Sequence, residues 1–182
     1  MKELSLNILD ITENSVKAGA TLTEITISED EETLKISIKD DGCGMSEETV
    51  KSVTNPFYTT RTTRKVGLGI PLLKLASEQT GGYITIESHV ADENDGSHGT
   101  KVEALFYKNH LDFTPLGDVI STLTTLIQGH PDTDFLFTHV RGSGEVRLDT
   151  RDLRAVLEDV PLNSFEVIVW IKDTLEEEYS NF

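Results

Sequence analysis

The sequence predicts an α+β fold, a two-layer α/β sandwich in which helices cover one face of a mixed sheet, followed by a small α+β module. Residues 22–28 and 34–39 alternate apolar and polar side chains, and the short acidic turn between them predicts a hairpin. Residues 83–88 and 100–107 are expected to complete the sheet. Residues 3–17 space their apolar side chains as an amphipathic helix does, so this segment is expected to cover the sheet.

Composition and charge exclude several classes of function. The chain has 182 residues, of which 37% are hydrophobic and 26% charged, as in globular proteins. Lysine and arginine number 16 against 32 acidic residues, and the net charge of −16 repels phosphate backbones and anionic lipid. We therefore expect no nucleic-acid partner and no membrane partner. The start of the chain has no cleavable signal, and with a single cysteine, Cys43, we expect a cytoplasmic protein.

A glycine-rich turn follows the second predicted strand. Its residues are Asp41-Gly42-Cys43-Gly44-Met45, at a point where the backbone must turn sharply. A carboxylate there can accept a hydrogen bond from an exocyclic amine, and the glycines leave room for a flat ring beside the backbone. The alternative interpretation is an ordinary turn, which Asp-Gly pairs often form.

One face of the first predicted helix carries polar residues at helical spacing. Asp10 and Asn14 are four residues apart, and Lys17 follows Asn14 by three, so all three can converge on one ligand. The alternative is a solvated helix surface with an ordinary ion pair.

A local group of cations stands out in this acidic chain. The block Asn55-Pro56-Phe57-Tyr58-Thr59-Thr60-Arg61 is followed by Arg64 and Lys65, and together they predict a short lid that closes over a triphosphate. Gly67-Leu68-Gly69 then opens a helix that starts at Ile70, and free amides at a helix N-terminus bind anions. An exposed basic loop is the alternative.

These blocks, in this order, resemble the ATP-binding domain of the GHKL superfamily, which sensor histidine kinases, Hsp90 chaperones, gyrase-type topoisomerases and mismatch-repair ATPases share. The resemblance covers residues 1–108 and is completed by Gly99-Thr100 at the start of the last strand of that region. It implies ATP and Mg²⁺ as cofactors, with Asn14 in the metal shell. The residues that it assigns to the nucleotide are Asn14, Lys17, Asp41, Gly42, Gly44, Met45, Phe57, Thr60, Arg61, Arg64, Lys65, Gly67, Leu68, Gly69, Ile70 and Thr100.

The resemblance also indicates where this chain departs from the family. Members that hydrolyse ATP efficiently usually carry Glu four residues before the Asn, whereas this chain has Asp10, one methylene shorter; Glu13 is the second candidate for a catalytic carboxylate. Asn14 followed by Lys17 resembles the kinase branch. Only nine residues precede Asp10, too few for the kinase hairpin that bears the phosphorylated histidine, so we expect any phosphoacceptor on another protein.

Residues 109–182 lie outside the resemblance and are expected to form the small acidic module. Thr114-Pro115 predicts the start of a helix, and two alternating runs around Arg141-Gly142-Ser143-Gly144 predict a hairpin. Asp149 is expected to cap a helix, and Asn163 with Glu166 has the spacing of a capping box. No catalytic pattern is evident, and a docking role is expected for this module.

The sequence therefore supports three functions. The preferred one is a stand-alone regulatory kinase that uses ATP and Mg²⁺ to phosphorylate a separate protein. The alternative is an ATP-driven conformational switch or slow ATPase, which regulates a partner or a second copy in a homodimer without transferring phosphate. The third is a nucleotide-binding fold that has lost its chemistry.

Overall fold

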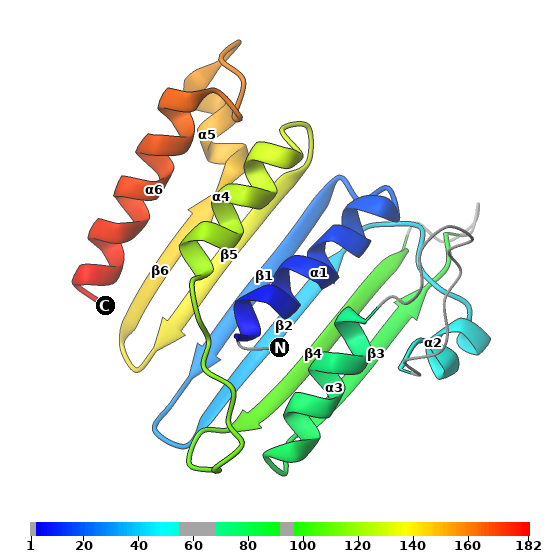
Figure 1. Cartoon of the computed structure of the whole chain (residues 1–182). Helices are drawn as coiled ribbons and strands as arrows, with labels where there is room; N and C mark the ends of the chain where they lie inside the picture. The colour runs from blue at the N-terminus through cyan, green and yellow to red at the C-terminus, as the bar shows by residue number, and fades with distance from the viewer. Residues whose placement is uncertain (1–2, 55–67, 92–96) are drawn as a thin grey trace.

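The computed structural model describes residues 3–54, 68–91 and 97–182, and all of its strands lie in one sheet of six with the order β3-β4-β2-β1-β5-β6 (Figure 1). The strands are β1 (Leu22–Glu29), β2 (Thr33–Asp40), β3 (Tyr83–His89), β4 (Gly99–Tyr107), β5 (Asp134–Arg141) and β6 (Gly144–Asp149). The helices are α1 (Leu4–Lys17), α2 (Glu47–Val53), α3 (Gly69–Gln79), α4 (Val119–Gly129), α5 (Thr150–Leu157) and α6 (Phe165–Ser180).

The sheet is mixed because one pair of strands, β1 and β5, runs parallel. Leu22 lies opposite Asp134 and Glu29 opposite Arg141 in that pair, whereas the other neighbours are antiparallel. The predicted hairpins β1–β2 and β5–β6 are both present. The boundary expected near residue 108 falls between β4 and α4, and the sheet continues across it, so the C-terminal module extends the sheet of residues 1–108.

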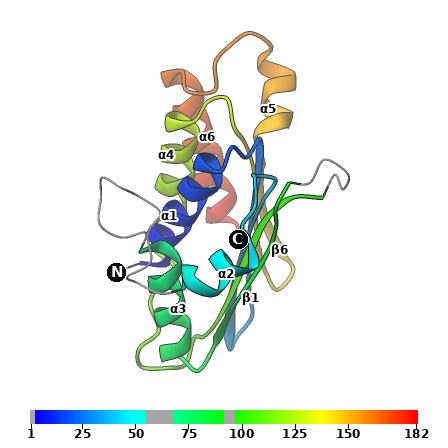
Figure 2. The ribbon, with the colours of Figure 1, turned by 90° about the vertical axis from the view of Figure 1, so that its right-hand side faces the viewer.

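Helices α1, α3, α4 and α6 lie side by side on one face of the sheet, which confirms the predicted two-layer sandwich (Figures 1 and 2). The opposite face carries ion pairs such as Lys39 with Glu24 at 3.1 Å and Lys35 with Glu103 at 2.8 Å. This face is polar because the side chains of each strand alternate between the core and solvent. Within the described ranges, no helix has the length and apolar character needed to cross a membrane.

The core forms one hydrophobic cluster that spans both parts of the chain. The α1 stripe of Leu4, Ile8 and Ile11 is buried against the sheet, as helical spacing predicts. Phe106 on β4 and Phe137 on β5 are both fully buried in the same cluster. Burying a side chain of this size contributes roughly 1.5–3 kcal/mol to stability, so the two parts share the main source of stability.

Local capping signals were only partly correct. Asp149 caps α5, as predicted, and Ser46 caps α2. The helix expected from Thr114 starts instead at Val119 with Asp118 as its cap, because the carbonyl oxygen of Pro115 accepts a hydrogen bond from the backbone N–H of Leu4, which begins α1. The capping box predicted at Asn163 is wrong, since α6 begins after Ser164 and its cap makes no side-chain hydrogen bond.

Candidate functional site

The glycine-rich turn after β2 packs against the end of α1. The N–H of Cys43 donates to the carbonyl oxygen of Ala18 at 2.9 Å, and a Cβ on Gly42 would lie 2.9 Å from the Cβ of Ala18. Gly44 has a φ of +70°, and a Cβ there would overlap the carbonyl oxygen of His89. Only glycine satisfies both the positive φ and the close approach at that position.

The carboxylate buried beside this turn belongs to Asp40, which the sequence analysis did not select. Its Oδ2 accepts from the hydroxyl of Ser15 at 2.7 Å, and its Oδ1 accepts from the N–H of Gly42 at 2.9 Å and of Thr100 at 3.3 Å. These three donors are neutral. A carboxylate with only 9% of its residue exposed is held here by hydrogen bonds from α1, the turn and β4 together.

Asp41, the residue that was expected to contact the ligand, points elsewhere. Its carboxylate accepts from the N–H groups of Thr21 and Leu22 at 2.7 and 2.9 Å, and from the hydroxyl of Thr21. Burial opposes the charge, but the hydrogen bonds from Leu22 and Thr21 outweigh it and lower the pKa of Asp41 below its usual 3.8. Asp41 therefore fixes the start of β1, and its position differs from the expectation because side chains alternate along β2 and place Asp40 on the buried face.

Thr100 and Met45, both predicted to contact the ligand, lie in the same neighbourhood. The N–H of Met45 donates to the hydroxyl oxygen of Ser88 at 2.8 Å, and that hydroxyl lies 2.7 Å from the hydroxyl of Thr100. An open hollow of about 370 Å³, lined in part by Met45, Ser88 and Ser97, adjoins the turn. His98 adds a further contact, since its Nδ1 lies 2.7 Å from the carbonyl oxygen of Gly42. The start of β4 is thus tied to the glycine turn through several short contacts.

The start of α3 rests directly on α1. A Cβ on Gly69 would lie 3.0 Å from the Cβ of Asp10, and the side-chain amide of Asn7 donates to the carbonyl oxygen of Gly69 at 3.5 Å. The exposed Asp10 is therefore placed beside the N-terminus of α3. Leu68 is exposed next to it, whereas Ile70 is buried in the core and is a packing residue.

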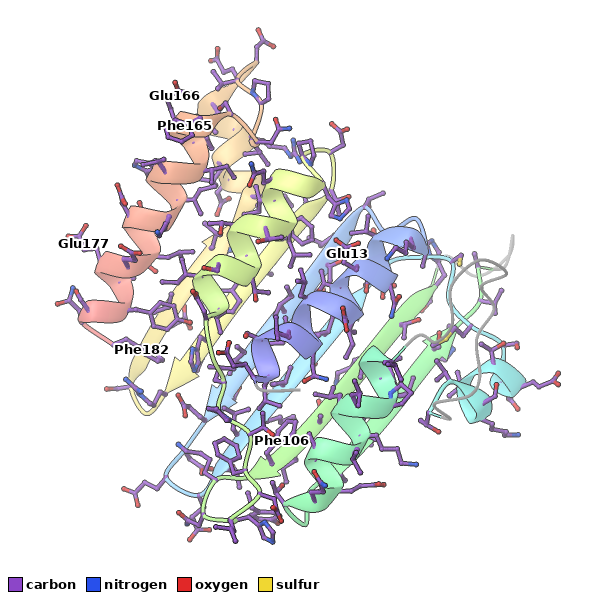
Figure 3. All side chains as sticks on the ribbon, viewed as in Figure 1. Glu13, Phe106, Phe165, Glu166, Glu177 and Phe182 are labelled. Carbon is purple, nitrogen blue, oxygen red and sulfur yellow. The ribbon has the colours of Figure 1, made fainter. Side chains whose placement is uncertain are left out.

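Glu13, the second catalytic candidate, faces α4 (Figure 3). Its carboxylate lies 2.7 Å from Nε2 of His130, which ends α4, and 3.4 Å from Nζ of Lys17. Burial opposes the charge of Glu13, but the contacts with His130 and Lys17 lower its pKa below the usual 4.5. Helix α1 thus presents Ser15 to Asp40, Asp10 to Gly69 and Glu13 to the C-terminal part, while Asn14 lies half-buried one turn after Asp10.

The remaining predicted contacts, Phe57, Thr60, Arg61, Arg64, Lys65 and Gly67, lie outside the described residues, so the cationic lid stays a prediction. Within the described ranges, no group of three or more histidine, cysteine or acidic side chains is placed to hold a metal ion. The residues that sequence reasoning missed are Ser15, Asp40, Ser88 and His98. Only Asp40 had a readable signal, because the alternation of Leu34, Ile36 and Ile38 extends to it.

Comparison with known proteins identifies the family. Residues 2–110 match the family described as "Histidine kinase-, DNA gyrase B-, and HSP90-like ATPase". Sporulation kinase A of Bacillus subtilis (strain 168) is 30% identical over 89 residues, which make up 49% of this chain and 14% of that kinase. Sporulation kinase E of the same organism is 33% identical over 88 residues, 48% of this chain and 12% of the kinase. The chain therefore spans only a small fraction of the length of these relatives.

Solved structures support the fold. The ATPase domain of Aquifex aeolicus MutL complexed with ADP superposes with a TM-score of 0.54 and 18% identity, covering 87% of this chain and 70% of that one. The N-terminal domain of a DNA repair protein gives a TM-score of 0.53 and 16% identity, covering 82% of this chain and 53% of that one. The order of the motifs, the mixed sheet under one layer of helices and the match over residues 2–110 lead to one conclusion: this chain belongs to the family of histidine kinase-, DNA gyrase B- and HSP90-like ATPases.

Proposed function

We propose that this chain binds ATP with Mg²⁺ and acts as a regulatory kinase on a separate protein. The observation that carries the proposal is the convergence of three elements on one helix. The start of α3 and the buried carboxylate of Asp40 contact α1 at Asn7, Asp10 and Ser15, and the glycine turn contacts Ala18, the residue that ends this helix. A ligand that touches all three must be long, with a flat polar end and an anionic end.

The flat end is assigned to the neighbourhood of Asp40. Each carboxylate oxygen has two lone pairs, so Asp40 retains acceptor capacity beyond its bonds to Ser15, Gly42 and Thr100. An exocyclic amine of adenine is a suitable donor. We therefore transfer to Asp40 the role that was expected for Asp41, while Gly42, Gly44 and Met45 keep their predicted places around the ring.

The anionic end is assigned to the start of α3 and the polar face of α1. Free amides at the N-terminus of α3 favour a phosphate group. The side-chain oxygen of Asn14 suits a Mg²⁺ ion, which prefers oxygen ligands and takes most of them from water and phosphates. When bound, the ion neutralises phosphate charge; Lys17 and the predicted lid cations Arg61, Arg64 and Lys65 would add to that effect.

Asp10 is the carboxylate that we assign to the chemistry. It is exposed beside Gly69, and therefore on the side where the phosphates would lie, whereas the carboxylate of Glu13 is already engaged with His130 at the end of α4. Asp10 would accept the proton of the attacking hydroxyl or water as the phosphate is transferred. The similarity to sporulation kinases favours transfer to a protein, with the acceptor supplied from outside this chain.

The test is incubation of the purified protein with γ-labelled ATP and Mg²⁺, in which free phosphate, self-labelling and labelling of added lysate proteins are followed together. The kinase proposal expects labelling of another protein, reduced roughly 100-fold or more by Asp10→Asn. Labelling that Asp10→Asn leaves unchanged contradicts the role of Asp10. If label reaches no protein while ATP still binds, the kinase proposal fails.

The alternative, an ATP-driven switch, is favoured by two contacts between α1 and α4. Helix α1 carries the proposed ligand residues and also touches α4, both through Glu13 and His130 and through the hydroxyl of Thr122, which donates to the carbonyl oxygen of Ser5 at 3.3 Å. A nucleotide that shifts α1 would therefore disturb the C-terminal part. Hydrogen exchange of residues 119–180 should then change when ATP is added, and unchanged exchange would contradict the switch.

A further inference from the structure

Exposed apolar side chains gather in the C-terminal part of the chain. Twelve large apolar side chains are exposed among the described residues, and five of them fall between residues 156 and 170. Phe165 is 77% exposed, Trp170 54% and Val169 39%, all on the first two turns of α6; we call these three residues the α6 patch. Val156 and Val160 precede it, at 81% and 49%. Single exposed apolar residues are common, but a concentrated group marks an interaction surface.

The α6 patch is not needed to hold α6 in place. The opposite face of the helix already buries Val167, Ile171 and Leu175 against the core. Figure 3 shows Phe165 on the outward side of the helix, together with the charged Glu166 and Glu177. The patch therefore lies on a face that faces away from the rest of the described chain.

Negative charge surrounds the α6 patch. Residues 156–182 contain seven acidic side chains and one lysine. The acidic residues are Glu158, Asp159, Glu166, Asp173, Glu176, Glu177 and Glu178. The lysine, Lys172, lies 3.7 Å from Glu176 and already has a carboxylate beside it. At helical spacing Glu166, Asp173 and Glu177 fall between Phe165 and Trp170, so this face of α6 interleaves aromatic side chains with carboxylates.

The negative charge indicates which kind of molecule can bind the α6 patch. A second copy would bring its own seven carboxylates against these, within a chain of net charge −16, and an anionic lipid surface would be repelled in the same way. A complementary surface places lysine or arginine among its apolar side chains. A short amphipathic helix with a basic polar face offers apolar and basic side chains together, as α6 itself offers its patch and its carboxylates.

We propose that the α6 patch is a docking surface for a basic amphipathic helix of a partner protein. Phe165 and Trp170 supply the apolar anchors, since aromatic residues dominate the energetics of such contacts. Glu166, Asp173 and Glu177 orient the partner through its cations. The proposal concerns a surface separate from the Asp40 site, and its test needs no nucleotide, so its failure and that of the kinase proposal are distinguishable.

The chain contains one tryptophan, Trp170, so its fluorescence reports directly on this surface. The probe is a synthetic leucine–lysine peptide of about 18 residues, or five helical turns, with leucines at helical spacing. One control peptide has the same composition in scrambled order, and another replaces lysine by glutamate. We expect a blue shift of Trp170 emission with the amphipathic basic peptide only, and weaker binding as salt is raised.

Variants localise the binding. Phe165→Ser should weaken peptide binding about 30-fold, and Glu166→Gln with Glu177→Gln should reduce its salt dependence. Leu111→Ser is the matched control, because Leu111 is 98% exposed and lies on the connection between β4 and α4, and it should leave binding unchanged. Thermal melting of each variant shows whether the fold is retained; the double glutamine variant keeps the test valid should Phe165→Ser unfold.

Four results would overturn the proposal. The first is equal binding of the scrambled or the acidic peptide, and the second is binding that neither Phe165→Ser nor the double glutamine variant changes. The third is a dimer in sedimentation that Phe165→Ser disperses. The fourth is a larger shift of Trp170 emission with zwitterionic lipid vesicles than with the peptide. The third result would make a second copy the occupant, and the fourth a lipid surface.

Discussion

The two parts of the sheet use their glycines and buried polar groups differently. In the part from α1 to β4, a Cβ on Gly44 or Gly99 would overlap the backbone of a neighbouring segment. In the C-terminal part, a Cβ on Gly117 or Gly144 would first meet a side chain, and Gly129 and Gly142 face open space. The first part buries the carboxylate of Asp40 against neutral donors. The second buries His139, whose Nδ1 lies 2.8 Å from the hydroxyl of Tyr179 and whose Nε2 lies 3.2 Å from the carboxylate of Glu29.

This contrast indicates that the part from α1 to β4 is suited to binding a ligand, whereas the C-terminal part is built to keep α6 on the sheet. Close backbone approach and a carboxylate with spare acceptor capacity suit a site that receives another molecule. In the C-terminal part, the buried histidine has partners on both ring nitrogens, supplied by β1 and α6, and this network fixes α6 on the sheet. This part also leaves Phe165, Val169 and Trp170 of α6 exposed. Ligand chemistry is therefore expected in the first part and partner docking in the second.

The largest expected effect tests whether the two parts are one cooperative unit. Phe106→Ala in the first part and Phe137→Ala in the second should each lower the free energy of unfolding by roughly 3–5 kcal/mol, because both rings are fully buried in one cluster. Urea unfolding followed by hydrogen exchange should show a single transition in both variants. If Phe137→Ala melts residues 119–180 while β1–β4 stay folded, the parts are independent and the contrast becomes one between two domains.

The second effect tests which carboxylate serves the ligand. Asp40→Asn should weaken ATP binding roughly 10- to 100-fold, as expected for the loss of a hydrogen bond to a charged group. Asp41→Asn is the matched control. It should leave ATP affinity nearly unchanged and lower only the stability of the free protein, since Asp41 binds Thr21 and Leu22. Isothermal titration measures the affinity, and the reverse pattern would restore Asp41 as the ligand residue.

The third effect concerns pH. Burial lowers the pKa of His139 below its usual 6.5 even though the Glu29 carboxylate, the stronger of the opposing influences, favours the charged ring. The unfolded chain therefore takes up a proton at a higher pH than the folded chain, and the free energy of unfolding should fall as the pH drops below about 6.5.

His139→Gln should remove the fall in the free energy of unfolding at low pH. Urea unfolding midpoints above and below the ordinary histidine pKa of 6.5 would measure it. A wild-type slope in His139→Gln would mean that another group titrates in this range.

The smallest effect tests the link between the two parts. Glu13→Gln should lower the free energy of unfolding by less than about 1 kcal/mol, because the pair with His130 and Lys17 is partly exposed. The pKa of Glu13 is lowered in the folded state, so its contribution is present above about pH 4.5 and is lost as the pH falls further. Glu24→Gln, which breaks an exposed pair with Lys39, is the control. An equal response of residues 119–180 to both variants in hydrogen exchange would show that the link carries no coupling.

The sequence predicted the fold class and most elements, and its errors have physical causes. The strand predicted over residues 34–39 is present as β2, Thr33–Asp40. The choice of Asp41 followed the Asp-Gly pair and did not extend the alternation of the strand to Asp40, and this alternation decides which side chain is buried. The helix start at Thr114 was wrong because Pro115 had a favourable local signal, while its carbonyl oxygen is used by α1 from the other end of the chain. Local capping signals do not include such distant partners.

Apolar periodicity in this chain was enough to predict helix α1, the strands β1 and β2 and the faces that they bury, because each depends on the geometry of a few neighbouring residues. The ordered motifs also identified the family. The parallel pairing of β5 with β1, the contact of Glu13 with His130 and the exposed outer face of α6 were settled only by the folded chain. The strand pairing and the Glu13–His130 contact join residues more than 100 positions apart. The exposed face of α6 is the face that remains after the helix has packed against its neighbours. No local sequence pattern determines either kind of feature.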